Sequence, residues 1–141
     1  MIELRKYAKL VPELFCSDID RSLRFYTGVL GFKVLYSRPE EHFAYLEREG
    51  AELMLDQSTT RRLLAEEPAY PYGRGINLQI EVSDVDALYK STVASDATIY
   101  LPMEEKWYRA DEELLGNRQF VVLDPDGYLL RFFKDLGSKP V

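Results

Sequence analysis

A four-residue motif that occurs twice constrains the fold of this chain more than any other feature. The sequence SDID at residues 17–20 returns 66 residues later as SDVD at residues 83–86. In each copy an apolar run precedes the motif, at residues 10–16 and 76–82, and a helical pattern follows it. The repeat therefore predicts two copies of one module, each of which begins with a strand, a cap and a helix.

The motif has the chemistry of a helix N-terminus. The Ser17 hydroxyl can accept a hydrogen bond from a backbone N–H of the first turn, and an acidic residue three positions later can reach back to the cap. Acidic side chains at this end also interact favourably with the helix dipole. Apolar residues then recur at helical spacing as far as Gly31 in the first module and Val93 in the second. Each helix is expected to bury one apolar face.

Each module is expected to have an opening strand before its helix and three strands after it. The expected strands are residues 3–15, with Pro12 at an edge or bulge, then 32–38, 42–48, 51–56, 76–82, 98–101, 118–123 and 128–133. We predict one domain over residues 1–141, divided into module one (8–57), a linker (58–75) and module two (76–134). The linker carries a short helical pattern at 61–67.

Module two is longer than module one. The hairpin glycines Gly50 and Gly127 are 77 residues apart, 11 more than the repeated motif. The extra residues are expected in an inserted excursion at 102–116, a usual place for ligand contacts.

Strand alternation separates a face under the helices from an open face. The open-face residues of a curved sheet line a cleft. The predicted open-face residues are Val11, Glu13, Phe15, Glu52, Met54, Asp56, Asn77, Gln79, Glu81, Leu129, Arg131 and Phe133.

Composition excludes several classes of protein. A net charge of −6 argues against nucleic acid as a partner and is compatible with a cationic ligand or with simple solubility. The single cysteine, Cys16, excludes an internal disulfide and a cysteine metal cluster. No apolar run approaches the ~20 residues that span a bilayer, and residues 1–10 lack the apolar core of a signal peptide. We expect a cytoplasmic protein with no membrane partner.

These residues resemble the vicinal oxygen chelate superfamily of glyoxalases, dioxygenases and bleomycin-resistance proteins. LFCSDIDRSLRFY at 14–26 and LGF at 30–32 match its strand, Asp-Leu, Ser, Phe-Tyr and Leu-Gly-Phe pattern, and RQF at 118–120 with DPDG at 124–127 resembles its closing hairpin. The resemblance implies an α+β fold of two βαβββ modules that form a curved mixed sheet with a cleft, in a dimer.

The resemblance also gives the positions of metal ligands. Metal-dependent members carry His, Gln or Glu seven residues before each capping Asp, and Glu or His four residues after each hairpin glycine. Here these positions are Val11, Asn77, Met54 and Arg131. This set lacks hard anionic donors and includes a permanent positive charge, so we expect no metal and no cofactor. The only histidine, His42, lies in a predicted strand, and no nucleophile and base pair can be identified, so we expect no catalytic residue and no enzyme activity.

Without a metal, the resemblance is closest to bleomycin-resistance proteins, which sequester cationic antibiotics in the grooves of a homodimer. In that group the amino-terminal strand, here residues 1–8, is a candidate for exchange between subunits. Arg131 either pairs with Glu52 or Glu81 or binds an anionic group. The expected ligand-binding residues are Glu13, Phe43, Tyr45, Glu52, Met54, Asn77, Gln79, Glu81, Trp107, Tyr108 and Arg131.

Three hypotheses remain open from the sequence. The first is a metal-free binding protein that sequesters an antibiotic, and the second is a metal-dependent lyase, isomerase or dioxygenase. A binding or scaffold protein for another small molecule is the third. In the first hypothesis Trp107, the only tryptophan, lies at the groove rim and stacks on the ligand, because its neighbours in the sequence are charged.

Overall fold

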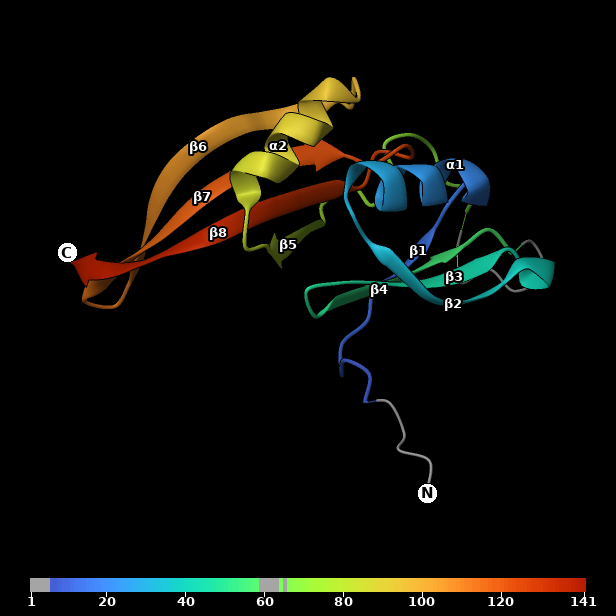
Figure 1. The fold of residues 1–141 in the computed structure, drawn as a ribbon, viewed down its shortest axis with the longest axis horizontal. Helices are drawn as coiled ribbons and strands as arrows, with labels where there is room; N and C mark the ends of the chain where they lie inside the picture. Colours follow the sequence, from blue (N-terminus) through green and yellow to red (C-terminus); the bar gives the residue numbers. More distant parts are fainter. Residues whose placement is uncertain (1–5, 59–63, 65) are drawn as a thin grey trace.

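Two four-stranded sheets, one from each half of the chain, carry the fold (Figure 1). This computed structural model describes residues 6–58, 64 and 66–141. The first half contains β1 (Glu13–Phe15), α1 (Ile19–Leu23), η1 (Arg24–Val29), β2 (Lys33–Arg38), η2 (Pro39–Glu41), β3 (Phe43–Arg48) and β4 (Ala51–Asp56). The second half contains β5 (Asn77–Glu81), α2 (Val85–Ala94), β6 (Ile99–Ala110), β7 (Glu113–Leu123) and β8 (Leu129–Pro140).

The two sheets have the same topology. The first sheet has the order β1-β4-β3-β2 and the second β5-β8-β7-β6. In each sheet the opening strand pairs in parallel with the last strand, whereas the other neighbours are antiparallel. The predicted α+β fold of two βαβββ modules is confirmed. No helix within the described ranges is long and apolar enough to cross a membrane.

Both helices begin at the repeated motif, one residue later than the serine predicts. The N-cap of α1 is Asp18, whose carboxylate accepts from the backbone N–H groups of Asp20 and Arg21, and the N-cap of α2 is Asp84. Ser17 does not cap the helix, because its hydroxyl donates to the Asp126 carboxylate instead. The motif therefore starts a helix through its aspartate and leaves its serine for a tertiary contact.

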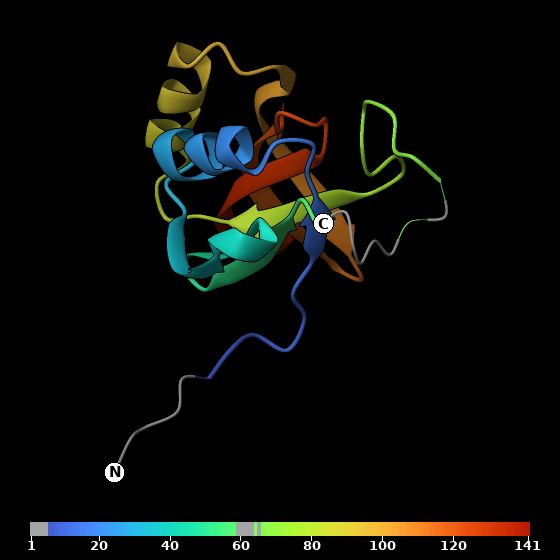
Figure 2. The same ribbon diagram turned by 90° about the vertical axis from the view of Figure 1, so that its right-hand side faces the viewer.

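The helices cover one side of both sheets and share one core. Figures 1 and 2 show α1 and α2 next to each other on this side, and the Ser91 hydroxyl of α2 donates to the Val29 carbonyl at 3.2 Å. Buried apolar residues of both halves form a single cluster: Leu14, Cys16, Tyr26, Leu30, Leu46 and Leu55 from the first, with Ile80, Val85, Phe120, Leu130 and Phe132 from the second.

The DPDG hairpin at 124–127 connects the two modules. The Asp126 carboxylate accepts from the Ser17 backbone N–H at 3.0 Å and lies 3.2 Å from the Arg21 guanidinium. The Tyr26 hydroxyl donates to Asp124 at 2.8 Å, and burial raises the pKa of the Asp124 carboxyl to about 6. A sequence motif that marks a turn thus also holds module one against module two.

The predicted excursion at residues 102–116 is not a loop. β6 and β7 form one continuous antiparallel pair. It runs from Ile99 opposite Val122 to Ala110 opposite Glu113 and has two bulges near its start. β8 follows them to Pro140, well past the predicted end at residue 133. β7 pairs with β6 on one side and with β8 on the other, so the extra residues lengthen a hairpin.

Four other segment predictions differ from the structure or fall largely on residues outside it. Of the strand predicted at 3–15, the structure describes residues 6–15, and among these Glu13–Phe15 forms β1. His42 caps η2 with a φ of 53°, and its side chain is exposed rather than part of a strand. The helical pattern at 61–67 and the exchangeable segment at 1–8 fall largely on residues that the structure does not describe.

Candidate functional site

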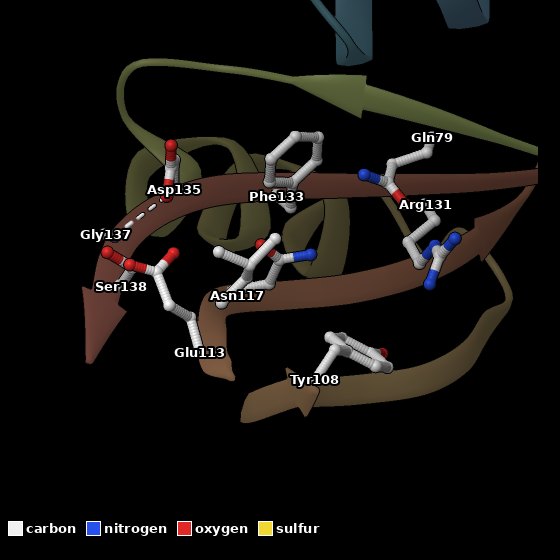
Figure 3. A pocket seen from close by; sticks show the side chains of 10 residues that line it. Gln79, Tyr108, Glu113, Asn117, Arg131, Phe133, Asp135, Gly137 and Ser138 are labelled. Carbon is white, nitrogen blue, oxygen red and sulfur yellow. Dashed lines mark hydrogen bonds between the residues drawn. The ribbon is translucent and has the colours of Figure 1, made fainter. Parts of the chain in front are cut away.

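A hollow of about 620 Å³ lies on the open face of the second sheet (Figure 3). We call it the sheet pocket. Its lining comes from all four strands of the sheet and consists of Gln79, Tyr108, Glu113, Leu115, Asn117, Arg131, Phe133, Asp135, Gly137 and Ser138.

Strand register explains why these side chains meet. Arg131 of β8 lies between Gln79 of β5 and Val121 of β7. Phe133 and Asp135 follow Arg131 on β8 at intervals of two residues and therefore point to the same face. Phe133 lies opposite Gln119 of β7, and Asp135 lies opposite Asn117. The predicted open face of β5 and β8 is therefore the face that lines the pocket.

A buried glutamine supports the pocket from β7. Gln119 is 1% exposed, and its side-chain amide donates to the Tyr108 hydroxyl at 2.6 Å and to a Glu104 carboxylate oxygen at 3.1 Å. These bonds hold the polar edge of the Tyr108 ring in place. Gln119 is absent from the predicted site residues because no open face was predicted for the strand at 118–123. The signal was nevertheless present, since residues 115, 117 and 119 alternate onto one face once the strand is extended.

The guanidinium of Arg131 has no carboxylate partner in the part of the chain that the structure describes. Its Nε is buried and makes no hydrogen bond, and no ion pair of Arg131 occurs within residues 6–58, 64 and 66–141. Of the two alternatives for Arg131, the internal pairing with Glu52 or Glu81 is therefore not found among these residues.

Charge is distributed unevenly along the sheet pocket. Figure 3 shows Arg131 and Gln79 at one end, Glu113 and Asp135 at the other, and Phe133 between them. Arg131 and Asp135 are four residues apart on β8, which corresponds to about 13 Å along an extended strand. The pocket can therefore receive groups of opposite charge at its two ends.

The predicted ligand-binding residues fall into several groups. Gln79, Tyr108 and Arg131 lie together in the sheet pocket. Asn77 and Glu81 share the face of Gln79 on β5 but do not line the hollow.

Trp107 is placed differently from the prediction. It is the β6 neighbour of Tyr108 and points to the opposite face, where its ring packs on Gly116 and the Lys139 ammonium lies 3.9 Å from the ring centroid. It does not line the sheet pocket. Residues 102–116 form paired strands, so Trp107 has packing partners that its charged neighbours in the sequence did not indicate.

The remaining predicted residues belong to the first sheet. Tyr45 is buried, its hydroxyl donates to Glu52 at 2.6 Å, and its ring stacks on Tyr36 with centroids 5.1 Å apart. Met54 lies opposite Tyr45 on β4. Tyr7 packs edge-on against the Tyr45 ring at 5.2 Å, so aromatic side chains cover this face.

Two predicted residues lie at the margins of the first sheet. Phe43 is buried under the Arg38 guanidinium, 4.0 Å from its ring centroid. Glu13 lines a smaller hollow of about 220 Å³ with Leu78 and Tyr128, between β1 and the second sheet.

The four positions at which the resemblance places metal ligands do not suit a divalent cation. Val11 has no donor, Met54 offers a thioether, Asn77 is neutral, and Arg131 brings a cation into the site. Across the described ranges, no three His, Cys, Asp or Glu side chains are grouped so that they could hold a metal ion.

Comparisons of the sequence with known proteins give a family match. A family model for the glyoxalase/bleomycin resistance protein/dioxygenase superfamily matches residues 8–132. A member of that superfamily from Vibrio splendidus is 41% identical, over 89% of this chain and 97% of that chain, with a TM-score of 0.42. No curated protein matches this chain.

Two further solved structures are similar in both sequence and shape. TioX from Micromonospora sp. is 25% identical, with a TM-score of 0.69, over 92% of this chain and 99% of that chain. A protein of unknown function from Agrobacterium tumefaciens is 27% identical, with a TM-score of 0.68, over 94% of this chain and 98% of that chain.

Proposed function

The chain belongs to the glyoxalase/bleomycin resistance protein/dioxygenase superfamily, and we propose that it is a metal-free binding protein that sequesters a small organic ligand in the sheet pocket. One observation carries this proposal. Arg131 occupies a position where metal-dependent members carry a ligand, and it lies in a polar hollow of about 620 Å³ on the open face of the second sheet. A guanidinium there binds organic groups and repels a divalent cation.

The competing function is a metal-dependent lyase, isomerase or dioxygenase of the same superfamily. It needs a Lewis acid, and the residues at the four ligand positions do not fit one. The side chains that could replace a metal are poorly suited to catalysis. Burial raises the pKa of the Cys16 thiol to about 12, and His42 is exposed at the end of η2, on the first sheet.

The shape and charge of the pocket indicate the kind of ligand. The rings of Tyr108 and Phe133 offer flat apolar surface for an aromatic system, and Glu113 and Asp135 suit a cationic group at the outer end. This combination supports a ligand of the bleomycin type, with another cationic aromatic small molecule as the alternative.

A second copy of the chain is proposed to complete the groove. The sheet pocket is an open hollow, and the first sheet presents aromatic side chains on its corresponding face, where Tyr7 is 44% and Tyr36 is 39% exposed. Apposition of the two faces in a homodimer removes this apolar surface from water. Light scattering should report a dimer at micromolar concentration, and a particle of 16.4 kDa would exclude the dimer groove.

Titration calorimetry tests the binding function. The protein should bind metal-free bleomycin or its copper complex at one site per chain. Glu113→Gln should weaken this binding several-fold because a charge-assisted contact is lost. Glu112→Gln in the adjacent exposed turn is the matched control and should not change it. If folded protein gives no heat with either form, sequestration of bleomycin is excluded.

A further inference from the structure

Arg131 is the one charged group of the sheet pocket that a cationic ligand does not use. Four arginines are half-buried within residues 6–58, 64 and 66–141. Arg38, Arg48 and Arg118 each pair with a carboxylate, of Glu41, Glu49 and Asp86 respectively. Arg131 is the fourth and has no such pair among these residues, although its Nε is buried.

The immediate surroundings of Arg131 explain why no carboxylate of the sheet reaches it. Its cross-strand neighbours on the open face are Gln79 and Val121, which carry no charge. The acidic residues of the pocket, Glu113 and Asp135, lie at the far end, beyond Phe133 (Figure 3). Removal of a guanidinium from water is unfavourable unless an acceptor replaces the lost hydrogen bonds.

We propose that the Arg131 end of the sheet pocket binds an anionic oxygen group of the ligand, a carboxylate, sulfonate or phosphate. This inference rests on the proposed binding function and narrows its ligand to an aromatic molecule with such a group. The planar fork of the guanidinium suits two oxygens of one anion, and the Gln79 side-chain amide lies next to it as a second donor. A cationic group at the Glu113 end then makes the ligand bipolar.

A matched pair of fluorescent probes isolates the anionic group. The probes are 8-anilinonaphthalene-1-sulfonate and N-phenyl-1-naphthylamine, which share one aromatic frame and differ in the sulfonate. The wild-type protein should bind the sulfonate about tenfold more tightly than the neutral amine. Arg131→Gln should remove this preference and leave the affinity for the neutral amine within about twofold.

Two further variants separate the roles of charge, geometry and folding. Arg131→Lys keeps the charge without the fork and should retain part of the preference, which also covers the case in which Arg131→Gln does not fold. Arg118→Gln removes an arginine from the helix-covered face, where it pairs with Asp86, and should change neither affinity. Circular dichroism of each variant confirms folding before titration.

The outcomes separate the two proposals. If the neutral amine binds but the wild-type protein shows no preference for the sulfonate, or if the preference survives Arg131→Gln, the assignment of Arg131 is overturned and the binding function stands. If neither probe binds the wild-type protein, the proposed binding function fails and the assignment of Arg131 fails with it.

Discussion

The open faces of the two sheets differ although the two modules follow one plan. On the first sheet, Tyr36 and Tyr45 stack on each other, Tyr7 covers the Tyr45 ring, and the carboxylate of Glu52 accepts a hydrogen bond from Tyr45. On the second sheet the same face is hollow and polar. A repeated scaffold therefore becomes a closed aromatic surface in one half and a pocket in the other.

Strand length accounts for much of this difference. β2, β3 and β4 have 6 residues each, whereas β6, β7 and β8 have 12, 11 and 12. The 10 residues of α2 cannot cover strands of this length, so the far end of the hairpin has side chains on two uncovered faces. The pocket occupies one face and Trp107 the other. Lengthening a hairpin thus created the surface that lines the sheet pocket, without a loop.

The largest expected effect comes from the core that the two modules share. Phe120 is fully buried in module two, with its ring centroid 4.9 Å from Tyr89 and 5.7 Å from Phe132. Phe120→Ala should lower the free energy of unfolding by about 3 to 5 kcal/mol. Tyr100→Ala, at an exposed aromatic of β6, should change it by less than about 0.5 kcal/mol and is the control.

Two single residues report on the two modules separately. Trp107 fluorescence follows module two, and labelling of the buried Cys16 thiol follows module one. Because the core is common, Phe120→Ala should speed Cys16 labelling in step with the fluorescence change. If Cys16 stayed protected from labelling while Trp107 fluorescence reported unfolding, the two modules would unfold independently and would not share one core.

The second effect is a pH dependence that arises from Asp124 in the hairpin of module two. Burial raises the pKa of Asp124 to about 6 in the folded protein, from the 3.8 of an ordinary aspartate. The folded state therefore holds this proton more tightly, and the contribution to stability is full below pH ~4 and is lost as pH rises through 6. In the hairpin of the first sheet, the acidic residue is Glu49, whose side chain is exposed.

A pair of variants measures this contribution. Between pH 7 and pH 4 the wild-type protein should gain on the order of 2 kcal/mol relative to Asp124→Asn, measured by urea unfolding across pH. Glu49→Gln should give a curve parallel to the wild-type curve. Parallel curves for wild type and Asp124→Asn would mean that the buried carboxyl does not titrate in this window.

The third effect separates the two faces of β6. Tyr108→Ala should weaken N-phenyl-1-naphthylamine binding about tenfold, because the ring lines the pocket. Trp107→Ala should leave this affinity within about twofold and lower stability by about 1 kcal/mol, since its ring packs on Gly116 and Lys139 on the other face. Weaker probe binding after Trp107→Ala would show that Trp107 contributes to the binding site.

The smallest expected effect is the absence of a response to metal removal. The ligand positions of the first sheet, Val11 and Met54, are no better suited to a cation than Asn77 and Arg131 of the second. Treatment with a chelator should not shift the melting temperature, and elemental analysis should find no stoichiometric divalent metal. One Zn, Mn, Fe or Ni per chain would restore the enzymatic hypothesis.

The sequence by itself determined the two modules, their helices and the open face of β5 and β8, because periodicity and caps are local properties. The face of Gln79 and Arg131 followed from strand alternation alone. The length of the β6–β7 hairpin could not be predicted from the sequence, because its polar and aromatic residues have the composition of a loop. They form long strands because β7 pairs with both β6 and β8.

Only the tertiary structure decided which open-face residues form a site. The Glu52 carboxylate accepts from Tyr45 and Arg131 is left without an ion pair among the described residues, although both were candidates from the sequence. Gln119 hydrogen-bonds to the pocket residue Tyr108, whereas Trp107 packs on Gly116 on the opposite face. Contacts between strands far apart in the chain set these outcomes, because they determine which side chains find partners within the protein and which remain available to a ligand.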